Sequence, residues 1–181
     1  MKDAKIGYLI SLTLEDNYYL GGFMITDQYG IPLEFKYTEP IKPTKIQKIL
    51  YGSALEKYLK KEVVFGNLLN SSAVKLDLLV TFKNDLLDLG TAPCPAISLE
   101  QTVLPPFSEI GQEETVNERE FLLQISPSGS PVRIMILPEK FNEKSKIINL
   151  LLELQNTMNL TEPLTRVEGA LKEICREMEK R

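Results

Sequence analysis

The first forty residues alternate between apolar and polar positions in the way that β-strands do. Three segments carry the pattern: Lys5–Leu14, Tyr18–Thr26 and Ile31–Thr38. The third alternates most regularly, which predicts a strand with one buried face. Between the second and third segments, residues 27–30 end in glycine and are typical of a tight turn in a hairpin. The N-terminal part of the chain is therefore predicted to form three strands, the last two as a hairpin.

Apolar residues recur at helical spacing over Thr44–Glu62, and Pro43 is well placed to open that helix. The apolar arc is wide, so we expect this helix to pack on more than one side. An apolar run at Leu76–Phe82 then predicts an interior strand, and Asp85–Leu89 predicts a short turn or helix.

Periodicity is lost over residues 90–118, where four prolines fall within 14 residues, at Pro93, Pro95, Pro105 and Pro106. A connection of this length is unusual inside a compact domain. The sequence predicts a long loop here, acting as a flap, an embracing arm or a flexible linker between two halves.

Regular patterns return with two strands, Phe121–Ser126 and Val132–Leu137, joined by a turn with proline and glycine. A buried helix from Asn142 to Thr157 follows, and then a last helix over Leu164–Lys180, capped by Thr161. The fold class is therefore α+β (mixed α/β) in a single compact domain, 1–181, with a mainly antiparallel sheet of five or six strands. The element order is βββαβ, the long loop, then ββαα.

The two halves share a pattern of strand, turn ending in glycine, strand, proline and helix. One copy covers 23–40 and leads into the helix at Thr44; the other covers 122–138 and leads into the helix at Asn142. We consider a duplicated ββα unit, although repeat architectures usually show at least three copies.

The composition excludes several classes of catalytic and metal site, whereas it says less about the fold. The chain has 181 residues and no histidine, which excludes Ser-His-Asp and Cys-His catalysis and histidine-ligated zinc. The two cysteines, Cys94 and Cys175, lie far apart and are expected to be free thiols. No apolar run reaches the roughly 18 residues that cross a bilayer, and no signal peptide is recognisable. We therefore expect a cytoplasmic protein without a membrane segment.

The order βββαβ over residues 5–85 resembles the opening of the ribonuclease H-like superfamily. That resemblance implies a divalent ion, Mg²⁺ or Mn²⁺, held by carboxylates on the first strand, the first helix and the fourth strand. Glu56 on the helix and Asp77 or Asp85 near the fourth strand are the candidate catalytic residues. The departure is in the first strand, because the centre of Lys5–Leu14 has no acidic residue.

Six lysines gather around the first helix, beside Tyr51 and Tyr58. They are Lys42, Lys45, Lys48, Lys57, Lys60 and Lys61. One interpretation is a basic patch for nucleic acid with tyrosines that stack on bases. The other is a solvated rim whose lysine stems cover apolar surface. Helical angles spread these lysines over much of the surface rather than along one stripe, which favours the second interpretation. The formal net charge of −4 also argues against broad phosphate binding, and nucleic acid is predicted to be an unlikely partner.

The last helix carries apolar residues at alternating spacings of three and four, the seam of a coiled coil. The seam residues are Leu164, Val167, Leu171, Ile174 and Met178. The leading interpretation is a non-catalytic protein-interaction or scaffold module without a cofactor, binding a protein partner or a second copy of itself as a homodimer through this seam. The alternative is a metal-dependent nucleic-acid-processing enzyme with a ribonuclease H-like core. A second alternative is a small-ligand-binding domain closed by the 90–118 loop.

Overall fold

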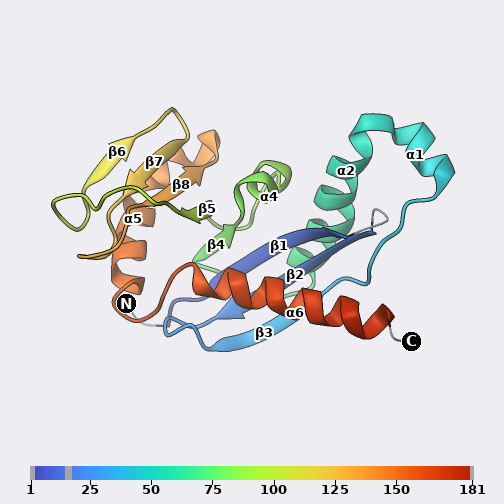
Figure 1. The fold of residues 1–181 in the computed structure, drawn as a ribbon, viewed down its shortest axis with the longest axis horizontal. Coiled ribbons are helices and arrows are strands. Elements are labelled where there is room, and N and C mark those ends of the chain that lie inside the picture. The colour runs from blue at the N-terminus through green and yellow to red at the C-terminus, as the bar shows by residue number, and fades with distance from the viewer. Residues whose placement is uncertain (1–2, 15–17, 180–181) are drawn as a thin grey trace.

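One eight-stranded sheet, in the order β3-β2-β1-β4-β5-β8-β7-β6, runs through the protein (Figure 1). The computed structural model describes residues 3–14 and 18–179. The strands are β1 Ile6–Leu14, β2 Tyr18–Thr26, β3 Pro32–Tyr37, β4 Leu78–Thr81, β5 Ala96–Gln101, β6 Glu113–Thr115, β7 Glu120–Leu123 and β8 Val132–Ile136. Strand β4 pairs parallel with both β1 and β5, and the other neighbours are antiparallel. The mixed α/β class is confirmed, but the sheet is larger and less antiparallel than predicted.

The predicted long loop at 90–118 contains two strands. Strand β5 lies in the interior of the sheet, between β4 and β8, and its first four residues are buried. A strand that is covered on both faces shows no alternation, which removes the signal that sequence periodicity provides. Strand β6 forms the edge beside β7, and all three of its residues are exposed. The interpretation of this stretch as one loop was therefore wrong.

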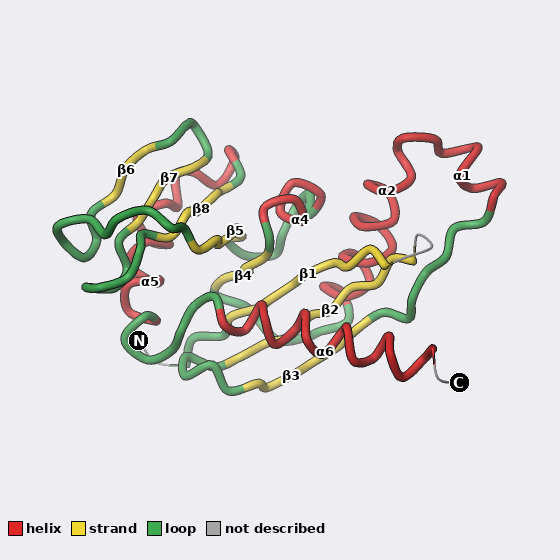
Figure 2. The backbone as a smooth tube through the Cα atoms, viewed as in Figure 1, coloured by secondary structure: helices red, strands yellow, loops and turns green. Residues whose placement is uncertain are grey.

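The helical segments are α1 Lys45–Tyr51, η2 Gly52–Ala54, α2 Leu55–Tyr58, η3 Leu59–Phe65, α3 Gly66–Asn70, α4 Lys83–Asp88, η4 Pro138–Glu143, α5 Lys144–Leu154 and α6 Glu162–Glu179 (Figure 2). The helix predicted over Thr44–Glu62 changes direction at Gly52, whose φ of +51° is one that glycine adopts more readily than other residues. Its second part continues to Asn70 through η3, a π-helical stretch. Within the described residues, no helix has the length and apolar character needed to cross a membrane. The predicted helix end at residue 180 lies outside the described residues.

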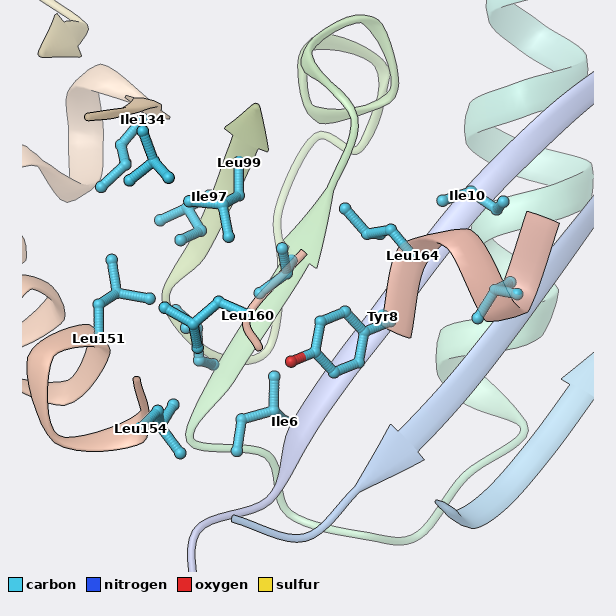
Figure 3. Packing of buried hydrophobic residues seen from close by; sticks show 14 of the residues in the cluster. Ile6, Tyr8, Ile10, Ile97, Leu99, Ile134, Leu151, Leu154, Leu160 and Leu164 are labelled. Carbon is cyan, nitrogen blue, oxygen red and sulfur yellow. The ribbon is translucent and has the colours of Figure 1, made fainter. Parts of the chain in front are cut away.

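Helices cover both faces of the sheet. Helices α5 and α6 pack on one face over the largest core cluster, which contains Ile6, Tyr8 and Ile10 of β1 together with Leu164 of α6 and Leu151 of α5 (Figure 3). The segments η3, α3 and α4 contribute to a second core cluster that also takes Leu9 of β1. Side chains of a strand alternate between its two faces. Odd-numbered residues of β1 therefore point toward η3 and α4, and even-numbered residues point toward α6.

The seam of the last helix packs on the sheet of its own chain. Leu164, Val167 and Leu171 are at most 2% exposed. Val167 and Leu171 lie over Gly22 of β2, where an added Cβ would come within about 3 Å of their methyl groups. Ile174 is half-buried and Met178 is 45% exposed. Most of the residues proposed as a dimer seam are thus already buried within the chain.

The two ββα units lie toward opposite ends of the sheet. Strands β2 and β3 lead to α1, which has no buried residue, whereas β7 and β8 lead to α5, which buries Ile147, Leu151 and Leu154. The units therefore resemble each other in element order and differ in how their helices pack. Their duplication stays a prediction.

Candidate functional site

The carboxyl ends of β1 and β4 bring together a serine and a buried carboxylate that are far apart in the sequence. Leu9 of β1 pairs with Thr81, the last residue of β4, so Ser11 lies level with the segment that follows β4. That segment forms α4, which carries Asp85 in its first turn. The Ser11 backbone N–H donates to Oδ2 of Asp85 at 2.7 Å, and its hydroxyl donates to Oδ1 at 2.6 Å.

Lys60 enters the same site from η3. Its Nζ lies 3.1 Å from Oε1 of Glu56 and 4.0 Å from Oδ1 of Asp85. Lys60 is one helical turn before Val64, which is fully buried against β2, so its side chain also turns toward the sheet. The Lys60 side chain is only 13% exposed and that of Asp85 only 5%. The ammonium group is therefore held in the site, away from bulk solvent.

The electrostatic state of Asp85 results from opposing effects. Burial raises the pKa of its carboxyl, because a charged group loses its hydration there. The two hydrogen bonds from Ser11 and the charge of Lys60 lower this pKa, while the nearby Asp88 raises it. Burial is the largest effect, so the pKa of Asp85 stays above its ordinary value.

A second charged cluster contacts α4 through Lys83, the first residue of that helix. Glu120, the first residue of β7, is buried and forms an ion pair with Lys83 of α4. Arg133 of β8 lies 3.6 Å from its Oε2, and the Asn117 side chain donates to the same oxygen at 2.9 Å. The bond with Lys83 is the main reason that the pKa of Glu120 is lowered. Sequence analysis missed this cluster, although an acidic residue opening the apolar run of β7 was a usable signal.

The structure brings together two of the three acids proposed as metal ligands. Glu56 and Asp85 share the ammonium of Lys60. Asp77 lies at the opposite end of β4, where its Oδ2 accepts the backbone N–H of Lys5 at 2.9 Å. Among the described residues, no three acidic or cysteine side chains are arranged to hold a metal ion. Two divalent ions bring a charge of +4, which two carboxylates and a lysine do not balance, so these residues do not fit a two-metal centre.

A lysine-bearing projection lies beside this site. We call residues 42–58 the lysine arm; it holds α1, η2 and α2, and α1 lies at its far end, away from the sheet (Figures 1 and 2). A capping box at Thr44 begins α1. Ile46, Ile49 and Leu50 are 69%, 79% and 75% exposed, so the expectation that this helix packs on several sides was wrong.

The polar and aromatic residues of the lysine arm are also exposed. Four of the lysines proposed as a patch lie on it and are exposed: Lys42, Lys45, Lys48 and Lys57. The rings of Tyr51 and Tyr58 lie 4.8 Å apart between centroids, at an angle of 37°. Of the remaining two lysines, Lys60 points into the site, and the stem of Lys61 packs against Gly90. The six lysines therefore do not form one patch, since four lie on the arm, Lys60 lies in the site and Lys61 lies against Gly90.

A cavity of about 630 Å³ lies near the amino ends of β4 and β5, between the η3–α3 helix and the segment after α4. Its lining includes Phe23, Leu76 and Leu89, with Lys61 and Glu62 among the polar residues. From the stretch 90–118, only residues 91–93 line it. That this stretch closes over a small ligand therefore stays a prediction.

Comparison with solved structures identifies proteins that share this fold. No protein-family model and no curated protein matches the sequence. Among solved structures, endonuclease V from Streptomyces avermitilis is 10% identical, with a TM-score of 0.59 over 97% of this chain and 83% of that chain. Endonuclease V from Ciona intestinalis, in complex with a 24mer DNA containing an inosine followed by a ribo-adenosine, is 12% identical with a TM-score of 0.60 over 98% and 88%. The catalytic domain of human endonuclease V is 10% identical with a TM-score of 0.56 over 99% and 85%.

At these identities the likeness establishes the fold, and it extends over nearly the whole chain. The predicted order of three strands, a helical segment and a fourth strand is present in the structure. The leading interpretation, a non-catalytic scaffold that binds proteins, is corrected, because the proteins that share the fold are nucleases. The expectation that nucleic acid is an unlikely partner is corrected as well, since one of these structures holds DNA.

Proposed function

We propose that this chain is a nucleic-acid-processing protein that binds an unpaired strand along the lysine arm and the adjoining site of Ser11, Lys60 and Asp85. One observation carries the proposal: on a fold shared with endonuclease V, the element beside the site is a projecting, lysine-bearing arm with exposed tyrosines. The strand's phosphates would meet the lysines, and its bases would meet the aromatic and apolar side chains.

The charge of the lysine arm differs from that of the whole chain. Residues 42–58 contain four lysines and one glutamate, a local charge of 4 − 1 = +3, whereas the chain as a whole carries −4. At physiological ionic strength, charges more than about 8 Å away are largely screened. A phosphate backbone beside the arm therefore responds to the local positive charge, and the net charge was a misleading guide to partners.

Aromatic side chains on the arm favour an unpaired strand over a duplex. Tyr51 and Tyr58 are 40% and 41% exposed, so ring surface is open to solvent. Stacking of one base on an aromatic ring contributes about 1–3 kcal/mol and tolerates any base. Bases inside a duplex do not offer their faces, which makes a single strand the better ligand.

Strand cleavage is the second candidate function, and the position of Asp85 favours it. A buried carboxylate stands at the carboxyl end of β4, on the sheet face to which β1 and η3 also contribute polar side chains. Ligands of open α/β sheets bind outside the carboxyl ends of the strands, so a strand lying on the arm would pass beside this end of β4.

The test is binding of fluorescently labelled single-stranded DNA and RNA, followed by anisotropy over a range of salt concentrations. In Lys45→Ala/Lys48→Ala, each lost phosphate contact should lower the slope of log K against log salt by about 0.7. The control, Lys146→Ala/Lys172→Ala, removes the same charge from the opposite face of the sheet and should bind as the wild type does. Equal affinity and slope for both pairs would contradict the proposal.

Cleavage is tested on the same oligonucleotides, with an inosine-containing DNA added, both in a metal chelator and in the presence of Mn²⁺ or Mg²⁺, because the site itself does not fit a two-metal centre. Products that form with the wild type and not with Asp85→Asn would support the second function. Binding without products would leave binding as the activity of this site.

A further inference from the structure

The positive charge beside Asp85 is the side-chain ammonium of Lys60. A buried carboxylate needs a nearby positive charge or hydrogen-bond donors, because its own hydration is lost. Here Ser11 supplies two donors, and the ammonium of Lys60 lies 4.0 Å from Asp85 and 3.1 Å from Glu56. The ammonium thus lies between the two acids of the site that could otherwise ligate a metal ion.

The backbone supports this arrangement. Lys60 is the second residue of η3, and π-helical stretches of this kind are frequent at functional sites. Its side chain is held on the face of the helix that packs on the sheet, since Leu59 and Val64 on either side are buried. A long side chain in that position brings its charge to Asp85 and has little room to leave.

We propose that the Lys60 ammonium takes the place of a divalent cation between Glu56 and Asp85 and keeps such an ion out of the site. The inference rests on the same site as the proposed function and does not depend on nucleic-acid binding. The charges agree with it: the two carboxylates bring −2 and Lys60 brings +1, so a divalent ion added beside Lys60 would leave an excess of positive charge.

The experiment replaces Lys60 with an uncharged side chain of similar length and measures the binding of Mn²⁺. Lys60→Met should bind the ion, detected by electron paramagnetic resonance and as a rise of several degrees in melting temperature at millimolar Mn²⁺. Both effects should vanish in Lys60→Met/Asp85→Asn. Wild type, Lys60→Arg and the control Lys61→Met should show neither.

Two results would overturn the inference. The first is Mn²⁺ binding to the wild type that Asp85→Asn abolishes, because the ion would then enter despite Lys60. This result needs no Lys60 variant, so it stays decisive if Lys60→Met does not fold. The second is a folded Lys60→Met that binds no Mn²⁺. Neither measurement uses an oligonucleotide, so failure of this inference and failure of the proposed function are separate results.

Discussion

At the scale of single residues, the site depends on a contact that spans 74 positions of the sequence, between Ser11 and Asp85. The Ser11 hydroxyl donates to the Asp85 carboxyl, so it stabilises the ionised form more than the neutral form. Burial already raises the pKa of Asp85, so its ionisation costs stability as the pH rises above its ordinary pKa of about 3.9. Loss of the hydroxyl would raise this pKa further.

Ser11→Ala should therefore lower the free energy of unfolding by about 1.5–3 kcal/mol at pH 7, the range for a hydrogen bond to a charged group. The loss should shrink as the pH falls below the pKa of Asp85 in the folded protein, because both proteins then carry a neutral carboxyl. Urea unfolding at pH 4 and pH 7 measures it, with the exposed Ser53→Ala as a control. A loss of the same size at both pH values would show that Ser11 acts through packing and not through the charge of Asp85.

Part of this site was identified from the sequence. Sequence reasoning selected Glu56 and Asp85 by the resemblance of element order, and Lys60 only as one lysine of a surface patch. It also selected Asp77, which the structure places at the opposite end of β4. Which end of a strand an acid occupies depends on where pairing starts and stops, and local patterns fix element boundaries least well.

At the scale of elements, the hydrophobic pattern identified the first three strands and the amphipathic α6. It also predicted one buried face for β3, and this was wrong, because the apolar side chains Leu33, Phe35 and Tyr37 are 48%, 37% and 50% exposed. It failed where burial and pattern diverge: β5 is covered on both faces, and α1 exposes its apolar residues. A pattern of apolar residues alone does not state whether another part of the chain covers them.

Shortening a leucine side chain should therefore lower stability strongly in α6 and only slightly in α1. Leu171→Ala on α6 removes a fully buried side chain and should cost about 2–5 kcal/mol of unfolding free energy. Leu50→Ala on α1 removes a side chain that is 75% exposed and should change stability by no more than about 0.5 kcal/mol. Chemical denaturation of both variants at the same protein concentration decides it. A large loss for Leu50→Ala would mean that another part of the chain or a second copy covers α1.

At the scale of the whole molecule, the order of strands and helices established more than composition did. The absence of histidine excluded several catalytic mechanisms, and a net charge of −4 suggested that nucleic acid was an unlikely partner. The fold shared with endonuclease V corrected that expectation, and the position of the lysine arm gives the reason: positive charge is concentrated on one projection while acidic residues are spread elsewhere.

The central claim is that a nucleic-acid strand lies along the lysine arm and the Asp85 site. Photo-crosslinking of a single-stranded oligonucleotide to the full chain, followed by mass spectrometry of the modified peptides, tests it most directly. We expect crosslinks to concentrate in residues 42–61, with Tyr51 and Tyr58 among the modified positions. Crosslinks confined to α5 and α6, on the opposite face of the sheet, would contradict the account.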